Sequence, residues 1–347
     1  MPGIAKQIIR IFFFLLIIGC NSLYAQEKAT PKNGEGLNAF LQRNKRPGTT
    51  YRKEFIELNK KKLGKNNTLI LGVQYSLPPL KDQTSKPTNT SSTTTNASST
   101  QKKKGKEPLF GQALAEYEIV SNELAGATFY VVSGHGGPDP GAIGKMGNYV
   151  LHEDEYAYDI ALRLARNLLM RGAKVHIIIQ DALDGIRDEQ ILKNSKRETC
   201  MGSEIPLNQI ARLNQRCEKI NALEKNNKPA YSRSIFIHID SRSKHKRTDV
   251  YFFHSDSKAS KRLSNTMKDT FTEKYRQSQP SRGFSGYVEQ RNLHVLNKST
   301  PVALFVELGN IQNSFDQQRF ILSNNRQALA NWLCDGFITD YNKNKPR

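Results

Sequence analysis

From about residue 127 onward, short apolar runs alternate with long amphipathic segments, and this alternation restricts the folds open to the chain. The apolar runs are ATFYVVSG, AKVHIIIQD, SIFIHID, DVYFFHS and PVALFVELGN. Helical spacing occurs between them and in a single terminal segment that begins FDQQRF. Near-continuous apolar strands that alternate with helices predict an α/β domain, with a largely parallel twisted sheet covered by helices on both faces. We place this domain at residues 108–343.

The beginning of the chain carries an export signal. Lys6 and Arg10 precede the apolar run IFFFLLIIG, and SLYAQ follows it. The run is short for a spanning helix, so residues 1–25 are interpreted as a signal peptide cleaved after Ala25. The alternative is lipidation at Cys20, although the bulky Ile18 makes LIIGC a poor lipidation motif. Both interpretations place the mature chain outside the cytoplasm, in the periplasm or secreted, without a membrane-spanning segment.

A tether separates this beginning from the α/β domain. Residues 81–107 are mostly Ser, Thr, Asn and Lys, with almost nothing apolar. Such a segment cannot bury enough surface to fold, so we expect a disordered linker that ends in the basic run KKKGK. Before it, residues 33–79 contain two short amphipathic segments, GLNAFLQR and YRKEFIELNK, and an apolar run, NNTLILGVQYSLPP. These pieces predict a separate small α+β module.

Charge and cysteine content limit the partners. The 52 Lys and Arg exceed the 32 Asp and Glu, for a net charge of +20, which suits a polyanion such as nucleic acid, an anionic membrane face or an acidic wall polymer. No nucleic-acid motif accompanies this charge, so nucleic acid is disfavoured. Cys200, Cys217 and Cys334 follow the signal segment. Three cysteines cannot all pair within one chain, and Cys200 with Cys217 is the nearest candidate disulfide.

Three metal-competent side chains lie at the ends of predicted strands. His135 follows FYVVSG in a glycine-rich loop, His238 ends SIFIHID, and Glu307 ends VALFVELG. Glu153 opens the first helix, near the loop that carries His135. In open α/β sheets, ligands bind beyond the carboxyl ends of the strands. Two imidazoles and one carboxylate with a fourth position open form a common catalytic zinc set, and a second carboxylate can accept a proton from water.

Structural explanations compete with this one. His238 alternates with apolar neighbours and is compatible with a histidine satisfied in the core. Glu153 and Glu155 are compatible with first-turn carboxylates favoured by the helix dipole. Glu307 is harder to explain structurally, because a carboxylate at the end of VALFV is costly to bury without a partner.

These residues resemble the zinc-dependent N-acetylmuramoyl-L-alanine amidases of bacterial cell walls over about residues 127–341. The similarity lies in GHGGPDPGAIG, HEDEYAYDIALRLARNLLMRGAKV, FIHID, RGFSGYVEQRNLHVLNKSTP and PVALFVELGNIQN. The sequence departs from the family pattern in VSGHGG, which lacks a preceding Asp-Pro, in Asn310, which replaces an aromatic residue, and in IDSRSKHKR. Residues 181–204 look like an insertion that forms a lid or a regulatory segment.

The resemblance implies an activity and a site. It implies Zn²⁺ held by His135, Glu153 and His238, with Glu307 as the catalytic carboxylate, and it places Arg291 and Asn310 as substrate-binding residues. The implied reaction is hydrolysis of the amide between N-acetylmuramic acid and L-alanine of peptidoglycan, in wall turnover or daughter-cell separation, with a possible protein activator.

The module at residues 33–79 resembles a LysM carbohydrate-binding module in GEGLNAFL, EFIELN and LILGVQYSLP. The opening strand usual for that module is missing from our prediction, and a small helical adaptor without a ligand is the alternative. Two other classes remain open for the whole chain. One is a non-catalytic wall-binding or regulatory protein on a degenerate amidase fold, and the other is a zinc peptidase or deacetylase.

Overall fold

The computed structural model describes residues 27–31, 37–46, 49–64, 67–80 and 103–345. The predicted signal peptide, Cys20 and most of the predicted linker lie outside these ranges. Among the described helices, none combines the length and apolar character that crossing a bilayer requires.

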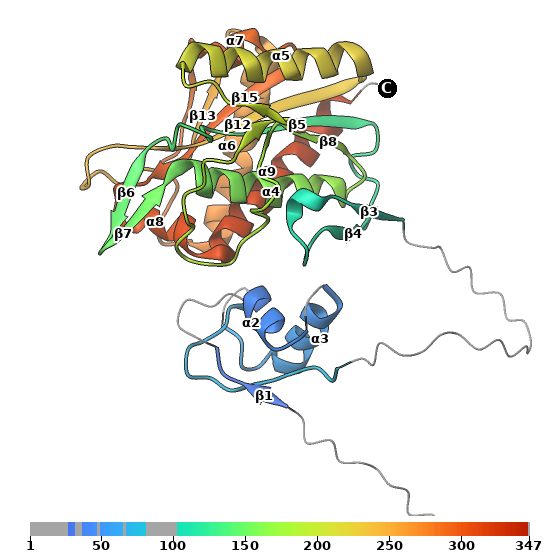
Figure 1. Ribbon diagram of the computed structural model, residues 1–347, viewed down its shortest axis with the longest axis vertical. Helices are drawn as coiled ribbons and strands as arrows, with labels where there is room; N and C mark the ends of the chain where they lie inside the picture. Colours follow the sequence, from blue (N-terminus) through green and yellow to red (C-terminus); the bar gives the residue numbers. More distant parts are fainter. Residues whose placement is uncertain (1–26, 32–36, 47–48, 65–66, 81–102, 346–347) are drawn as a thin grey trace, which may run out of the picture.

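A six-stranded sheet forms the centre of the α/β domain (Figure 1). Its order is β14-β13-β15-β12-β5-β8, in which β8, β5, β12 and β15 are mutually parallel. β13 runs antiparallel to β15, and β14 runs parallel to β13. The strands are β5 (Ala127–Ser133), β8 (Lys174–Ile177), β12 (Tyr231–Asp240), β13 (Tyr251–His254), β14 (Val288–Gln290) and β15 (Val302–Asn310). The predicted α/β class and largely parallel sheet are confirmed.

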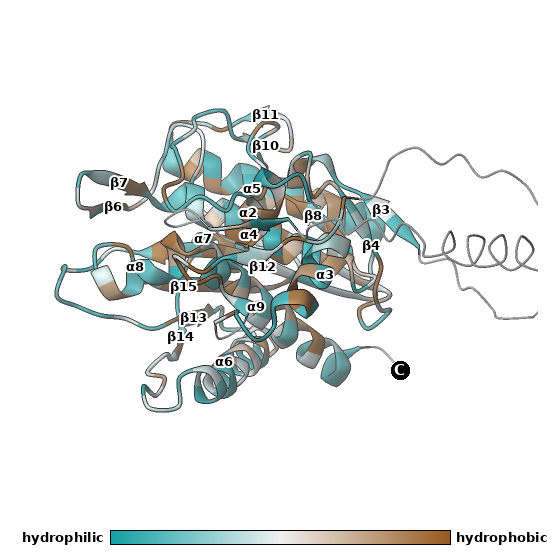
Figure 2. Ribbon diagram, turned by 90° about the horizontal axis from the view of Figure 1, so that it is seen from below, coloured by the Kyte–Doolittle hydropathy of each residue, from teal (hydrophilic) through white to brown (hydrophobic). Residues whose placement is uncertain are grey.

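Helices cover both faces of this sheet, as predicted. One face packs against α4 (Glu153–Leu169), α6 (Lys258–Ser278) and α9 (Ser323–Asn344), and the other against α5 (Gln209–Asn227) and α7 (His294–Lys298). Alternation along each strand divides its residues between two apolar clusters, so Ile237 and Val306 face α4 and α9, while Phe236 and Phe305 face α5 and α7. Figure 2 shows hydrophobic residues gathered around the sheet and hydrophilic residues on the outer helix surfaces.

Several elements escaped prediction. The predicted single terminal helix is interrupted at Leu322, whose extended backbone separates α8 (Ser314–Ile321) from α9. A hairpin of β6 (Ile143–Met146) and β7 (Tyr149–His152) leads directly into α4. Two strands of the insertion, β10 (Thr199–Cys200) and β11 (Ser203–Glu204), form a small antiparallel sheet with β9 (Ile179–Gln180), which directly precedes the insertion.

The predicted linker extends too far toward the α/β domain. Its last residues form β3 (Lys104–Lys106), which pairs antiparallel with β4 (Glu116–Glu118), and a short 3-10 helix, η2 (Pro108–Phe110), lies between them. Lys104 lies opposite Glu118 and Lys106 opposite Glu116, so opposite charges favour the pairing. Residues 103–106 of the basic run therefore belong to an ordered edge of the domain, and composition alone concealed this because the partner strand begins ten residues further on.

The N-terminal module has its own apolar core. Its helices are α2 (Leu37–Arg43) and α3 (Thr49–Asn59), and its sheet pairs β1 (Lys28–Ala29) with β2 (Tyr75–Ser76). Phe40, Phe55 and Tyr75 are fully buried and their rings contact one another. The strand β1 lies before the predicted start of the module, in a stretch where the sequence analysis expected no strand, and it is only two residues long.

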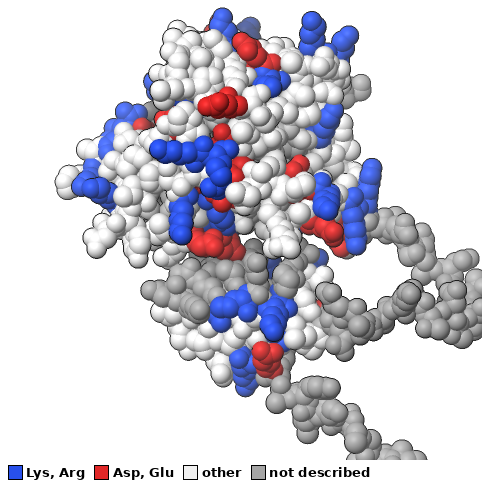
Figure 3. Space-filling model, viewed as in Figure 1, with Lys and Arg blue, Asp and Glu red and all other residues white. Residues whose placement is uncertain are grey.

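The basic residues do not form one continuous patch on the face seen in Figure 3, where Lys and Arg are interspersed with Asp and Glu. Cys200, Cys217 and Cys334 are buried free thiols. The candidate Cys200–Cys217 disulfide is therefore absent from the described part of the chain.

Candidate metal centre and catalytic site

His135 lies in a tight loop directly after β5. Its φ of 58° is in the left-handed region, and Arg216 of α5 donates a hydrogen bond to its backbone carbonyl. Glycines on both sides permit close approach of the other site residues. A Cβ at Gly141 would lie 2.6 Å from Glu153 Oε2, and a Cβ at Gly134 would overlap the ring of His238. The glycine-rich sequence around His135 is therefore required by packing.

Glu153, the first residue of α4, holds this site together. Its Oε2 lies 3.2 Å from His135 Nε2, and its Oε1 lies 3.0 Å from His238 Nδ1. The backbone N–H groups of Ala142 and Ile239 donate to the same two oxygens, at 2.7 and 2.9 Å. The carboxylate is thus fixed between the two imidazoles. Potential ligand atoms of His135, Glu153 and His238 all lie within 4.8 Å of one another.

Glu307 lies beside this cluster on the neighbouring strand. It is the register partner of His238 in the β12–β15 pair, and both side chains belong to the face of the sheet that α5 and α7 cover. Among the described residues, no group donates a hydrogen bond to Glu307 Oε2, which is buried. Burial, together with the nearby carboxylates of Glu153 and Asp240, raises the pKa of Glu307 well above its usual value. A raised carboxyl pKa suits a group that accepts and returns a proton.

Asp139 is a site residue that the sequence analysis missed. Its Oδ2 lies 2.7 Å from His135 Nδ1, so it fixes the ring with Nε2 toward Glu153. Burial would lower the pKa of His135, but hydrogen bonds to Asp139 and Glu153 raise it to about 10. The site therefore stabilises positive charge. The sequence could have indicated Asp139, which is a carboxylate four residues after His135 in the same loop. A histidine that binds a metal commonly donates its other N–H to a carboxylate.

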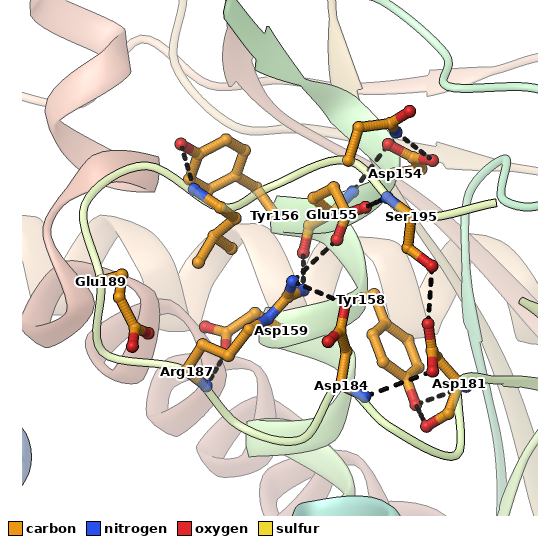
Figure 4. Close-up of polar contacts among 12 residues, drawn as sticks. Asp154, Glu155, Tyr156, Tyr158, Asp159, Asp181, Asp184, Arg187, Glu189 and Ser195 are labelled. Atoms are coloured by element: carbon orange, nitrogen blue, oxygen red, sulfur yellow. Dashed lines mark hydrogen bonds and ion pairs between the residues drawn. The ribbon is translucent and has the colours of Figure 1, made fainter. Parts of the chain in front are cut away.

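The insertion at residues 181–204 is attached to α4 beside the site (Figure 4). Arg187 Nη1 contacts Glu155 Oε2 at 2.9 Å, and its backbone N–H donates to Asp159 Oδ1 at 2.7 Å. Further along, Ser195 Oγ donates to Asp181 Oδ2 at 2.7 Å. These contacts involve buried carboxylates, so the segment is part of the domain's packed structure.

One residue of the insertion contacts the loop that carries His135. Glu198 Oε2 accepts a hydrogen bond from the backbone N–H of Gly137 at 2.8 Å. Glu198 also lies with Asp154 and Glu155 in a second buried group of carboxylates, and burial and these neighbours raise the pKa of Asp154 to about 8. The insertion thus holds the loop of His135 through the hydrogen bond from Gly137 to Glu198.

The two predicted substrate-binding residues lie in different surroundings. Arg291 is exposed, stacks on Phe253 with its Cζ 4.9 Å from the ring centroid, and lines a polar hollow of about 590 Å³ with Asp256 and Gln290. Asn310 is fully buried, and its amide donates to the carbonyls of Ser243 and Lys246.

Only Arg291 has the exposure that contact with a substrate requires. Because Asn310 has no exposed face, we revise its role from contacting substrate to holding the loop after β12. Substrate contact by Arg291 stays a prediction.

A smaller cavity of about 190 Å³ adjoins the two histidines. Its walls come from the His135 loop, α5, α7, β12 and β15. The lining residues are His135, Asp139, Gln209, Arg212, Leu213, Arg216, Phe236, His238, Leu293, His294, Val295 and Phe305.

Comparison with known proteins identifies the family. The family described as N-acetylmuramoyl-L-alanine amidase matches residues 130–339, which is more than half of the chain. The chain belongs to this family, and membership supports peptidoglycan amidase activity. It also favours action outside the cytoplasm. No curated protein sequence matches the chain.

Solved structures similar to this chain carry amidase names. An N-acetylmuramoyl-L-alanine amidase from Clostridium difficile 630 is 21% identical with a TM-score of 0.46, over 65% of this chain and 100% of that one. AmiC2 of Nostoc punctiforme is 18% identical with a TM-score of 0.44, over 65% and 99%. The CwlD amidase of Clostridioides difficile, solved in complex with the GerS lipoprotein, is 16% identical with a TM-score of 0.46, over 62% and 99%.

Proposed function

We propose that this chain is a zinc-dependent enzyme that hydrolyses the amide between the lactyl group of N-acetylmuramic acid and L-alanine of the stem peptide. The observation that carries the proposal is the grouping of His135, Glu153 and His238, with Glu307 beside them. Two imidazoles and one carboxylate with an open fourth position fit a catalytic zinc. When bound there, zinc lowers the pKa of water and polarises a carbonyl oxygen.

The protein's own residues supply orientation and proton transfer. Glu153 and Asp139 fix the His135 ring through its Nε2 and Nδ1 atoms, and β12 places His238 opposite Glu307. Glu307 accepts the proton of the attacking water at its carboxylate and returns it to the departing amine of L-alanine. The buried Oε2 of Glu307, to which no residue in the described ranges donates a hydrogen bond, and the raised pKa of this carboxyl support that assignment.

The other parts of the chain suit a role at the cell wall. The N-terminal module would bind glycan strands as a LysM-like module does and raise the enzyme's effective concentration there. We place the mature protein in the periplasm or outside the cell after cleavage following Ala25, where it would act in wall turnover or daughter-cell separation. Control by a protein activator is part of the proposal, and a nucleic-acid partner is not.

Digestion of purified sacculi tests this function. The chain without its signal peptide is incubated with sacculi, with a chelator, and with zinc restored after chelation, and the products are identified by mass spectrometry. We expect metal-dependent release of stem peptides that begin with L-alanine, while glycan strands remain intact. No release in the presence of zinc would favour a non-catalytic wall-binding protein, and release of fragments cut within the peptide would favour a peptidase.

A further inference from the structure

The loop that follows β12 has a basic sequence that the proposed function does not use. Residues 241–247, SRSKHKR, are all exposed. Arg242 forms an ion pair with Asp240, with Nε 2.6 Å from Oδ2. Three other cations of the loop form no ion pair with any described residue, and they are Lys244, Lys246 and Arg247. The loop therefore presents positive charge to the solvent without a neighbouring acid to neutralise it.

Buried amide side chains fix the backbone of this loop. Asn310 Nδ2 donates to the carbonyls of Ser243 and Lys246, at 3.0 and 2.7 Å. Asn313 Nδ2 donates to the carbonyl of Lys244 at 2.8 Å. The backbone is thus held against the domain, while the lysine side chains extend into the solvent. A loop that is already ordered loses less conformational entropy when it binds a partner.

The segment that holds this loop also holds the β6–β7 hairpin. Gln317 Nε2 donates to the carbonyl of Lys145 at 2.9 Å, and Gln312 Nε2 donates to the carbonyl of Ile143. Residues 310–317 therefore orient both the hairpin and the loop after β12. Both project from the same side of the domain, beside α8 (Figures 1 and 2).

The surface that these parts form combines cations with exposed apolar side chains. We call it the basic rim, and it comprises residues 145–150, residues 241–247 and Phe315. Tyr149 is 58% exposed, Val150 41% and Phe315 46%. Arg247 lies over Phe315, with its Cζ 3.5 Å from the ring centroid. The sequence of the basic rim contains no Asp or Glu.

We propose that the basic rim binds the surface of an anionic lipid bilayer. Acidic headgroups attract Lys and Arg, and aromatic side chains enter the boundary between headgroups and acyl chains. A soluble polyanion would match the cations but would leave Tyr149, Val150 and Phe315 in water. The presence of both kinds of side chain on one rim therefore favours a bilayer.

Binding at the rim would set the proposed metal site close to the membrane. β7 ends directly before Glu153, and the loop begins three residues after His238. The two parts of the basic rim thus continue from segments that carry proposed ligands. Rim binding would direct the enzyme to wall strands that lie near the membrane.

Sedimentation with vesicles tests this proposal. The chain without its signal peptide is mixed with vesicles of equal parts phosphatidylglycerol and phosphatidylcholine, or with vesicles of phosphatidylcholine alone. We expect binding to the anionic vesicles that falls as salt is added, and little binding to the neutral ones. The assay contains no peptidoglycan, so its outcome is independent of the proposed function. Equal binding to both kinds of vesicle, or binding to neither, would overturn the proposal.

Charge variants separate the rim from the net charge of +20. Each Lys or Arg near an anionic surface contributes about fivefold, so Lys244→Gln, Lys246→Gln and Arg247→Gln together should weaken vesicle binding about 100-fold. The matched control replaces three exposed cations of α6, as Lys258→Gln, Lys261→Gln and Arg262→Gln. The control should lose much less binding, and an equal loss in both triple variants would overturn the assignment to the rim. Thermal unfolding checks that both are folded.

Apolar contact distinguishes a bilayer from a soluble polyanion, and it is measured even if the loop variant does not fold. Tyr149→Trp adds a second tryptophan to Trp332. Its emission should shift to shorter wavelength with anionic vesicles and stay unchanged with polyphosphate. Tyr149→Ser with Val150→Ser should weaken vesicle binding about tenfold and leave polyphosphate binding unaltered. No emission shift and no loss of vesicle binding would assign the rim to a soluble polyanion and overturn the proposal.

Discussion

His238 and Glu307 are register partners on the parallel strands β12 and β15, so the sheet itself holds a proposed metal ligand beside the proposed catalytic carboxylate. This relationship separates two roles that mutation can test. The imidazole of His238 contacts Glu153, whereas Glu307 Oε2 is buried and receives no hydrogen bond from the part of the chain that the structure describes. Loss of the carboxylate should therefore affect proton transfer and leave metal binding in place.

Glu307→Gln is expected to retain zinc and to lose about 10²- to 10⁴-fold in turnover, because the amide cannot accept the proton of water. Metal content by mass spectrometry and release of stem peptides from sacculi check this prediction. Glu289→Gln, an exposed residue of β14, is the matched control and should retain full activity. Full activity of Glu307→Gln would show that another group is the base.

Asp139→Asn is expected to weaken zinc affinity by about 10- to 100-fold, because Asp139 fixes the ring of His135 from its Nδ1 side. Competition with a chromogenic chelator measures the affinity. The exposed Asp256→Asn serves as the control. An unchanged affinity in Asp139→Asn would mean that the loop backbone alone orients His135.

Asp159→Asn is expected to lower the free energy of unfolding by about 3–5 kcal/mol, because it leaves two buried cations without their shared partner. Asp159 Oδ2 contacts Arg163 Nε at 2.7 Å and Arg326 Nε at 2.6 Å. Urea unfolding at neutral pH measures this loss, with exposed Asp269→Asn as the control.

The same carboxylate predicts a pH dependence of stability. Burial would raise the pKa of Asp159, but Arg163 and Arg326 lower it to about 2. The stabilisation that Asp159 provides is therefore complete above its unfolded pKa, near 4, and is lost as the pH falls toward 2. In urea titrations over this range, the difference between the native chain and Asp159→Asn should shrink, and a constant difference would contradict the assignment.

Deletion of residues 183–197 is expected to destabilise the domain without raising activity. The segment contains Arg187 and Ser195, which contact the buried carboxylates of Glu155 and Asp181. A removable lid would behave in the opposite way, with faster hydrolysis and unchanged stability. Thermal unfolding and the rate on a soluble muramoyl peptide distinguish these outcomes.

Removal of the N-terminal module is expected to reduce binding to sacculi by about 10²-fold and to leave the rate on a soluble muramoyl peptide unchanged. A chain that begins at residue 103 keeps β3 and the whole α/β domain. Sedimentation with sacculi measures binding. Unchanged sedimentation of the shortened chain would favour the alternative of a helical adaptor without a ligand.

The fold was predictable where each strand is apolar throughout. ATFYVVS and VALFVELGN are buried on both faces, so their composition alone indicated inner strands of a parallel sheet. The edge strands β3 and β14 were not predictable, because KGK and VEQ acquire strand structure only from their neighbours. The break at Leu322 was not predictable either, because no glycine or proline marks it.

The candidate site was predictable only in part, because some of its residues reach the site only through contacts between segments that are distant in the sequence. Strand ends and a helix start indicated His135, Glu153, His238 and Glu307 without any knowledge of distance. Arg216 escaped notice because it lies in the middle of an amphipathic helix, where a charged residue usually faces water. It donates a hydrogen bond to the carbonyl of His135, which is some eighty residues away in the sequence.

Arg326 contacts parts of the chain that lie far from it in the sequence and are synthesised much earlier. From α9 it contacts Asp159 of α4, and it also donates to the backbone carbonyls of Arg187 and Glu189 in the insertion. Both α4 and the insertion therefore gain their contacts with Arg326 only after α9 has packed against them. Completion of the hydrolytic centre is therefore coupled to completion of the polypeptide, and a chain truncated before α9 should be inactive even though it contains every proposed ligand.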